Sequence, residues 1–477
     1  MGPSPPAPTP RPWPAVARGP FCDCGGAATG AVLACPRRDD PDVDCVPRLD
    51  DDPSLPLVSD PTSDQPFLRY AGHIAAWRRS PGGYAQTVDA LDDAVADLTG
   101  RPVTVTPTVQ APGLAAALGR PGIRLLVKDE TGLPAGSHKI RHLFGMGLHL
   151  RLAGPASTEG ERPRLAISSC GNAAYAAAVV AAAMEWPLDV FVPVDVDPAV
   201  LSELERFGAR VVPCSRTAGQ AGDPCHHAFR TAVAAGAVPF GVQGPDNAWC
   251  LDGGRTIGFE LAEAAGAVGA LDHVVVQVGG GALASATYAG LALATQIGVL
   301  PRHPVLTAVQ TVGAAPLSRA GALVAARAER QGLGAALAWA VRHRSQVMWP
   351  WEREPRSVAG GIIDDVTYDW AAVTDAVLSG GGSFPLVDDV ELEASNRLVG
   401  ERLGVAADET GSAGLAGLVS TLDAVSDGSV VAVLLTGVRR SPAHPSRGGG
   451  AGHDEAAVDR SGAEVAVQLR VGVPGPQ

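Results

Sequence analysis

The stretch LPAGSHKIR, residues 133–141, holds one of the two lysines in a chain of 477 residues. The second lysine is Lys128, and arginine supplies the rest of the basic charge. Arginine keeps its proton, whereas a desolvated lysine can lose its proton and form a Schiff base with an aldehyde. A chain this poor in lysine is expected to keep the residue where such an amine is useful, with an ion pair as the alternative for either lysine. The surroundings of each must decide between them.

Composition limits the classes of protein to consider. Hydrophobic residues make up 46% of the chain and charged residues 18%, which is typical of a globular protein long enough for two lobes. The net charge of −13 argues against nucleic acid or an anionic membrane surface as a partner. The proline-rich start has no apolar segment of signal-peptide length, so we expect a cytoplasmic protein.

From residue 124 onward, short apolar strands alternate with helices, which predicts parallel sheets covered by helices on both faces. An amphipathic helix is also expected at Tyr84–Leu98, and a strand at Val103–Val105. The expected strands are Arg124–Val127, Leu165–Ile167, Leu188–Val194, Arg210–Val212, Val238–Phe240, His273–Gln277, Val305–Val309 and Val430–Leu435. The expected helices are Gly113–Leu118, Lys139–Leu152, Asn172–Met184, Pro198–Phe207, Asp223–Ala235, Gly254–Ala265 and Ala282–Ile297.

Changes in composition suggest domain boundaries. Residues 1–64 are rich in Pro, Asp and Cys and indicate a weakly ordered lead-in, and residues 441–477 indicate a disordered tail. Four cysteines of the lead-in lack the spacing of zinc knuckles, which favours free thiols over a zinc site; they are Cys22, Cys24, Cys35 and Cys45. The acidic residues Asp364, Asp365 and Asp369 indicate a charged loop rather than a cation site.

Three further turns follow predicted strands. Ser169, Cys170, Asn172 and Ala173 lie where a strand passes into a helix, and the positive end of a helix dipole favours an anion there. A glycine-rich turn comprises Gly279, Gly280, Gly281, Ala282 and Leu283, in which backbone N–H groups can converge on a phosphate. Thr436 ends the last apolar strand with a hydroxyl group.

In order and spacing, these motifs resemble the fold-type II pyridoxal-phosphate enzymes, such as threonine synthase and the serine and threonine dehydratases. The resemblance covers about residues 66 to 440. It implies a two-lobed α/β fold similar to the tryptophan synthase β chain, each lobe being a largely parallel sheet flanked by helices. The larger, cofactor-binding lobe would span residues 65–140 and 241–440, and a smaller mobile lobe with the asparagine turn residues 141–240.

The resemblance also implies roles for the site residues. Lys139 would carry pyridoxal 5'-phosphate as a Schiff base and act as general base. The glycine turn from Gly279 to Leu283 would hold the phosphate. Asn172 would contact the phenolic oxygen and Thr436 the pyridine nitrogen, while Ser169, Cys170 and Ala173 would bind the carboxylate of the substrate. A homodimer acting on a small amino acid is expected from the family.

The resemblance implies a lyase or threonine synthase-like enzyme that eliminates or replaces a β or γ substituent of an amino acid. Some residues depart from the family pattern. Cys170 stands where Ser, Thr or Ala is common, and Gly360 stands where the dehydratases have Asp. Two alternatives stay open: a Rossmann-like oxidoreductase with a dinucleotide at the glycine turn, and a cofactor-binding homologue without turnover. The missing acidic ribose partner counts against the dinucleotide.

Overall fold

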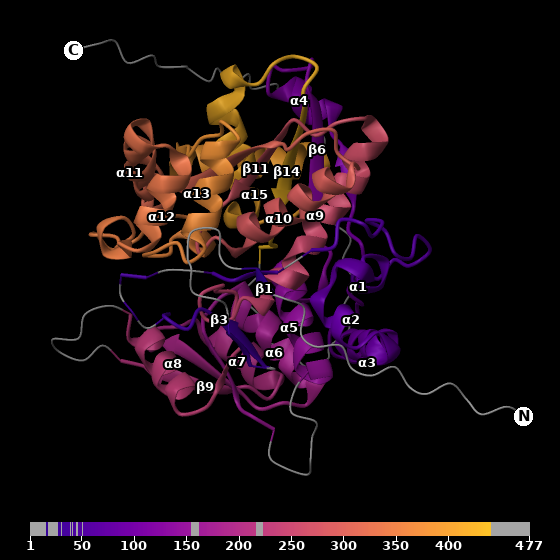
Figure 1. The fold of residues 1–477 in the computed structure, drawn as a ribbon, viewed down its shortest axis with the longest axis vertical. Coiled ribbons are helices and arrows are strands. Elements are labelled where there is room, and N and C mark those ends of the chain that lie inside the picture. Colours follow the sequence, from indigo (N-terminus) through magenta and orange to yellow (C-terminus); the bar gives the residue numbers. More distant parts are fainter. Residues whose placement is uncertain are drawn as a thin grey trace, which may run out of the picture. The chain divides into compact units, whose positions relative to one another are not determined.

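The computed structural model describes residues 51–153, 162–215 and 223–439, most of residues 31–49, and the backbone of two short strands at Val16–Ala17 and Ala27–Thr29. The predicted tail, residues 441–477, lies outside the described residues, as do Cys22, Cys24 and Cys45. Cys35 is described and is buried. Figure 1 shows the course of the chain.

The smaller sheet has four parallel strands in the order β10-β7-β8-β9. Helix α6 consists almost wholly of alanine and valine, and its Ala177 and Val180 are buried in the same core as Ile167 and Val190 of the sheet. Helix α8 packs on the sheet through Phe229, which joins Phe191 in a separate cluster. The bounds are β7 (Leu165–Ser168), α6 (Asn172–Met184), β8 (Leu188–Pro193), α7 (Pro198–Arg206), β9 (Arg210–Cys214), α8 (Pro224–Ala234) and β10 (Val238–Pro239).

The larger sheet has six strands in the order β13-β12-β11-β14-β6-β5, and only the pair β5–β6 is antiparallel. Successive residues of its central strand face opposite sides, as strand geometry requires. Val274 and Val276 belong to one core cluster, and Val275 belongs to another. The strands are β5 (Thr108–Gln110), β6 (Arg124–Asp129), β11 (His273–Gln277), β12 (Val305–Thr311), β13 (Leu386–Val387) and β14 (Val430–Leu435).

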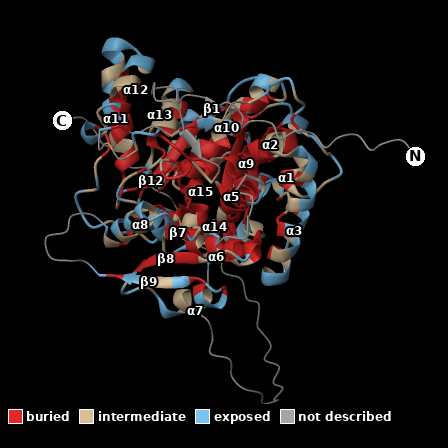
Figure 2. Cartoon of the chain, turned by 60° about the horizontal axis from the view of Figure 1, so that its bottom comes forward, coloured by how far each residue is buried: buried red, intermediate tan, exposed pale blue. Residues whose placement is uncertain are grey.

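Helices cover both faces of the larger sheet. Buried residues of α9, α10, α11, α12 and α13 share the cluster of Val274 and Val276, whereas those of α4, α14 and α15 share the cluster of Val275. Figure 2 shows the buried residues concentrated inside these layers, while outer helices such as α3 expose one face. The bounds are α4 (Pro112–Ala117), α9 (Trp249–Val268), α10 (Ala282–Ile297), α11 (Pro316–Gln331), α12 (Leu333–Val341), α13 (Trp370–Ser379), α14 (Asp389–Leu403) and α15 (Glu409–Thr421).

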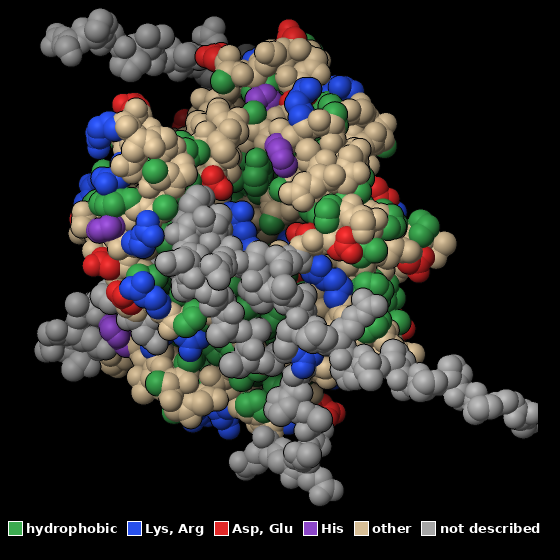
Figure 3. Space-filling view, viewed as in Figure 1, with side chains coloured by type: hydrophobic (Ala, Val, Ile, Leu, Met, Phe, Trp, Pro, Cys, Tyr) green, Lys and Arg blue, Asp and Glu red, His purple; other side chains and the backbone are tan. Residues whose placement is uncertain are grey.

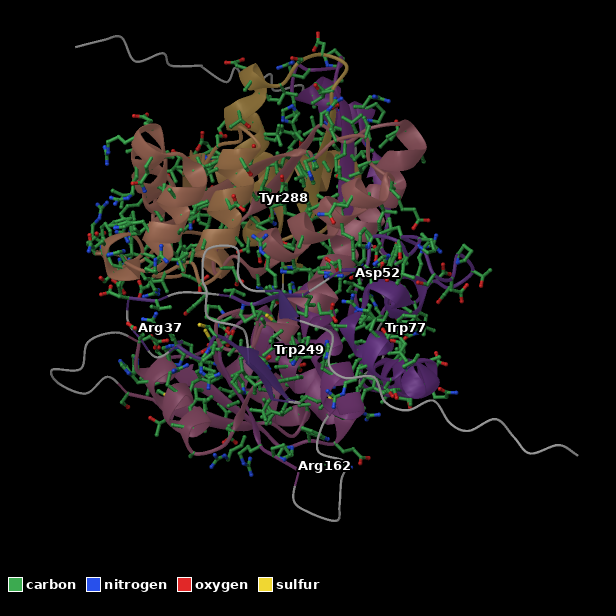
Figure 4. The ribbon with its side chains drawn as sticks, in the orientation of Figure 1. Arg37, Asp52, Trp77, Arg162, Trp249 and Tyr288 are labelled. Carbon is green, nitrogen blue, oxygen red and sulfur yellow. The ribbon has the colours of Figure 1, made fainter. Side chains whose placement is uncertain are left out.

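Helices α5 (Lys139–Ala153) and α9 pack against each other beneath the lysine stretch. Trp249, labelled in Figure 4, begins α9, and its ring stacks on His149 of α5 with 4.0 Å between ring centroids. His149 Nε2 lies 2.9 Å from Asp252 Oδ2, and His142 Nδ1 lies 2.8 Å from the carbonyl oxygen of Cys250. These buried contacts fix the direction in which α5, and therefore Lys139, enters the molecule.

The remaining described α-helices and strands lie before β5. Leu33 of β3 is fully buried, and its N–H donates to Asn247 Oδ1 over 3.1 Å, so this part of the lead-in packs on the body of the protein. The elements are β1 (Val16–Ala17), β2 (Ala27–Thr29), β3 (Val32–Ala34), β4 (Arg48–Leu49), α1 (Pro66–Arg69), α2 (Ala75–Arg79) and α3 (Pro81–Thr99). No helix in the described ranges is long and apolar enough to cross a membrane.

The predicted fold class is confirmed. The protein is α/β, and the smaller and the larger sheet are both largely parallel and flanked by helices. The strand expected at Val103–Val105 is wrong. The N–H of Val103 donates to the side chain of Asp92 and that of Val105 to the carbonyl of Asp64, so neither joins a ladder. The domain boundaries proposed from composition stay predictions.

On the face shown in Figure 3, basic and acidic side chains are interspersed.

Candidate functional site

The two lysines have different environments in the structure. Lys128 on β6 is fully buried, and its Nζ donates to the carbonyl oxygen of Thr106 over 2.7 Å and to the carboxylate of Glu260. Glu130 lies 3.7 Å from the same amine and accepts from Arg141 Nε over 2.6 Å, and Arg141 also donates to Glu260. Two buried cations therefore face two buried carboxylates. Lys128 is an ion-pair lysine, held between the two carboxylates.

The lysine stretch is held against the exit of β14. Ala135 and Gly136 both take left-handed backbone conformations, with φ of 64° and 62°. A Cβ on Gly136 would stand 2.6 Å from Val438 Cγ2, so glycine is required there by both conformation and space. The N–H of His138 donates to the carbonyl oxygen of Thr436 over 3.2 Å. These contacts place Lys139, the first residue of α5, beside Thr436.

The asparagine turn reaches the same place. Asn172 begins α6, and its Nδ2 lies 3.1 Å from the position that a Cβ would take on Gly437. Ser169 Oγ accepts from the N–H of Gly171 within its own turn, and Cys170 is exposed. Ala173 is buried in the first turn of α6. The first N–H groups of a helix have no partner inside it, so this end of α6 can bind a carboxylate.

The glycine turn joins β11 to α10, whose first residues are Ala282 and Leu283. Gly281 has a φ of 97°, which favours glycine. The segment 361–369 packs on one side of the turn. Thr367 Oγ1 donates to the carbonyl oxygen of Gly279 and the N–H of Asp369 to that of Gly280, each over 2.9 Å. The conformation of the turn is therefore fixed by a neighbouring segment.

Asp364 brings a carboxylate to this turn. Its Oδ2 lies against Gly279, where a Cβ would stand, and it accepts a hydrogen bond from the backbone N–H of Gly280. Burial raises the pKa of Asp364 to about 6, and the positive charge of Lys139 opposes that rise. Burial in turn lowers the pKa of Lys139 below its ordinary value, and the negative charges of Asp364 and Asp369 oppose that fall. The amine therefore loses its proton more readily than an exposed lysine does.

Two polar atoms beside Lys139 test whether the residues fit a phosphate-bearing aldehyde. Ser137 Oγ and His138 Nε2 are buried and have no hydrogen-bond partner within the described part of the chain. Buried polar atoms are rarely left without a partner, so a polar group bound at this place would satisfy them. A reactive amine, unsatisfied polar atoms and a glycine turn fit pyridoxal 5'-phosphate.

The predicted residues are brought together to different degrees. The lysine stretch, Asn172 and the segment of Thr436 are in direct contact, and the glycine turn is linked to Thr436 through Gln277. Sequence analysis missed Gln277, although a polar residue ending an apolar strand is a signal, and it did not connect Asp364 with the glycine turn. The described residues hold no group of three or more His, Cys, Asp or Glu that could bind a metal ion.

Comparison with known proteins agrees with this geometry. The model of the family described as "Pyridoxal-phosphate dependent enzyme" matches residues 101–437. The threonine synthase of Synechocystis sp. is 24% identical over 335 residues, which cover 70% of this chain and 75% of that protein. The threonine synthase of Mycobacterium leprae is 26% identical over 344 residues, which cover 70% and 82%.

Solved structures show the same fold. Maize serine racemase superposes with a TM-score of 0.54 at 20% identity, covering 74% of this chain and 94% of that chain. The processed form of threonine deaminase isoform 2 from Solanum lycopersicum superposes with a TM-score of 0.54 at 17% identity, covering 74% and 85%. The resemblance to fold-type II enzymes is confirmed, and the cofactor of the family is pyridoxal 5'-phosphate rather than a dinucleotide. The chain belongs to the family of pyridoxal-phosphate dependent enzymes.

Proposed function

We propose that this enzyme eliminates or replaces a substituent at the β or γ carbon of an amino acid, with Lys139 as the attachment point of the cofactor and the general base. The observation that carries the proposal is the difference between the environments of the two lysines. Lys128 forms ion pairs with two buried carboxylates, while Lys139 lies beside Asn172 and Thr436. Similar proteins named threonine synthase and similar structures named threonine deaminase and L-serine ammonia-lyase support this class of reaction.

The proposed cofactor contacts follow the placement of the residues. The N–H groups of Gly279, Gly281, Ala282 and Leu283 would hold the phosphate, joined by that of Gly280 once the phosphate replaces the carboxylate of Asp364. Lys139 would hold the aldehyde carbon. Asn172 would contact the phenolic oxygen, and Thr436 would face the ring nitrogen. When bound, pyridoxal 5'-phosphate withdraws electrons from the α carbon of an amino acid and so acidifies its α proton.

The protein's own groups supply the remaining steps. The lowered pKa of Lys139 makes an unprotonated amine available to take the α proton. Ser169, Cys170 and Ala173, at the start of α6, would bind the carboxylate of the substrate and orient that proton toward the amine. A hydroxyl rather than a carboxylate at the ring nitrogen favours elimination and replacement over transamination. We also propose a homodimer and a cytoplasmic location, which sedimentation and cell fractionation test.

The test uses the absorbance spectrum of the purified protein and of two variants. Lys139→Ala removes the amine, and Lys139→Arg keeps the positive charge but cannot form the covalent link. We expect a visible cofactor band in the wild type that both variants lose, and a keto acid or a replacement product from one member of a panel of amino acids and O-phosphohomoserine. A wild type that shows no band after addition of the cofactor would refute the proposal. A band without product from any amino acid would indicate a homologue without turnover.

A further inference from the structure

The side chain of Gln277, the last residue of β11, is buried at the end of the larger sheet. Its Nε2 lies 3.1 Å from the carbonyl oxygen of Thr410, 3.0 Å from that of Gly411 and 3.4 Å from that of Leu434. Three carbonyl oxygens around one atom of an amide require that atom to be the nitrogen, because an oxygen there would face only acceptors. The orientation of the Gln277 amide is therefore fixed by the backbone around it.

The same nitrogen lies 2.7 Å from Thr436 Oγ1. Because the amide nitrogen has only hydrogens to offer, Gln277 donates and the Thr436 hydroxyl accepts. A hydroxyl that accepts through one lone pair must direct its own hydrogen elsewhere. Within the described residues, Thr436 Oγ1 makes one hydrogen bond, which it accepts from Gln277. The hydroxyl hydrogen of Thr436 is therefore available to a bound ligand.

The backbone of Thr436 is held independently. Its N–H donates to the carbonyl oxygen of Gly411 over 3.1 Å, and its carbonyl oxygen accepts from the N–H and the ring Nδ1 of His138 over 3.2 and 3.1 Å. The remaining freedom of the residue is the direction of its hydroxyl hydrogen, and Gln277 sets that direction.

We propose that Gln277 is a positioning residue that turns the hydroxyl hydrogen of Thr436 toward the ring nitrogen of the bound cofactor and so keeps that nitrogen unprotonated. The inference rests on the proposed function, which places Thr436 at the ring. A ring nitrogen that accepts a hydrogen bond carries no proton, and it draws less negative charge into the ring than a protonated one does. Gln277 thereby contributes to the choice of elimination or replacement over transamination.

The experiment loads the enzyme with pyridoxal 5'-phosphate isotope-labelled at the ring nitrogen and follows the nitrogen NMR chemical shift with pH. In the wild type we expect the chemical shift of an unprotonated ring nitrogen at every pH in the range over which the ring nitrogen of the free cofactor titrates. Gln277→Met keeps the length of the side chain and removes the donor. In this variant we expect the nitrogen to take up a proton within that range and the Kd for the cofactor to rise about tenfold, the worth of one good hydrogen bond.

Asn396→Ala is the matched control. Asn396 Nδ2 donates to the carbonyl oxygen of Ala407 over 2.8 Å and to Ser412 Oγ over 3.0 Å, so it steadies the same end of α15 without a hydrogen bond to Thr436. Its loss should lower the melting temperature and leave the nitrogen shift unchanged, which separates a stabilising role from a positioning role.

Two results would overturn the inference: a protonated ring nitrogen in the wild type, or a Gln277→Met nitrogen that titrates as the wild type does. If Gln277→Met does not fold, Gln277→Leu, which also lacks the donor to Thr436, takes its place in the titration. An enzyme that turns over substrate with a protonated ring nitrogen refutes the inference and leaves the proposed function standing. An unprotonated nitrogen without turnover refutes the function and leaves the inference standing.

Discussion

The amide nitrogen of Asn172 lies 3.1 Å from the position that a Cβ would take on Gly437, so the turn before α6 and the segment after β14 touch across the site. Gly437→Ala would push the amide away from the place proposed for the cofactor ring. We expect about tenfold weaker cofactor binding, the loss of one hydrogen bond. A titration followed by absorbance measures this. Gly400→Ala, which meets nothing within 4 Å, is the control and should bind the cofactor as the wild type does.

The two lysines should differ in their effect on stability. Lys128→Met leaves Glu130 and Glu260 buried with one cation fewer, and we expect the free energy of unfolding to fall by about 3–5 kcal/mol. Lys139→Met in cofactor-free protein removes a partly desolvated amine and should change stability little. Urea denaturation of both variants without cofactor tests the pair, and equal losses would contradict the assignment of roles.

Gly136 should tolerate no side chain. Gly136→Ala would combine a left-handed backbone with a Cβ 2.6 Å from Val438 Cγ2, and we expect a loss of about 1–3 kcal/mol. Gly132→Ala, earlier in the same connection, meets nothing within 4 Å and serves as the control. Thermal denaturation compares the two variants. Indistinguishable melting temperatures would show that the lysine stretch is not held against Val438.

Asp364 should make stability depend on pH. Burial raises the pKa of Asp364 to about 6, above the ordinary value of 3.8. The folded state therefore holds this proton more tightly than the unfolded state, and the resulting stabilisation is present below about pH 4 and is lost as the pH rises through about 6. Asp364→Asn should stabilise cofactor-free protein at pH 8 by about 2 kcal/mol, allowing for solvent screening, and not at pH 4.

Melting temperatures across this pH range measure the difference between Asp364→Asn and wild type. Asp365→Asn in the same loop is the control, since Asp365 is exposed and should shift the curve less. A constant difference between Asp364→Asn and wild type at all pH values would show that the carboxyl does not titrate as expected.

The charge around the substrate turn predicts a preference among substrates. Partial desolvation and then the negative charges of Asp223 and Asp195 raise the pKa of the Cys170 thiol, so carboxylates lie near this turn. An anionic side chain would be repelled, and we expect kcat/KM for O-phosphohomoserine to be at least about tenfold below that for neutral or cationic amino acids. Raising the salt concentration should reduce the difference in kcat/KM between O-phosphohomoserine and the neutral or cationic amino acids, because salt screens the repulsion. Equal values at low salt would contradict this expectation.

Local patterns predicted several elements to the residue, because the signal for each is contained in its own sequence. Asn172–Met184 and Ala282–Ile297 follow glycine turns and are rich in alanine, and Val430–Leu435 is a continuous apolar run. The β-branched residues of Val103–Val105 also favour a strand, yet the side chain of Asp92 and the carbonyl of Asp64 accept from the N–H groups of Val103 and Val105. Strand pairing depends on the neighbours that a segment meets, which its own sequence does not contain.

The turns that make up the candidate site could be predicted from the sequence. The contacts between those turns could not. The lysine, asparagine, glycine and threonine turns could be recognised from their sequences. The bond between Gln277 and Thr436 joins two strands separated by more than a hundred residues, and the contact of Asp364 with Gly279 joins a loop to a turn. Both depend on the order of strands in the larger sheet, which no local pattern specifies.

The position of β14 has a consequence for synthesis of the chain. This strand, Val430–Leu435, lies between β11 and β6 in the middle of the larger sheet. A ribosome must therefore release almost the whole described chain before β6 gains its parallel neighbour. The smaller sheet joins strands from residues 165–239 and can assemble much earlier. During translation the unpaired edges of β6 and β11 are exposed, so the nascent protein is expected to depend on chaperones until its last strand arrives.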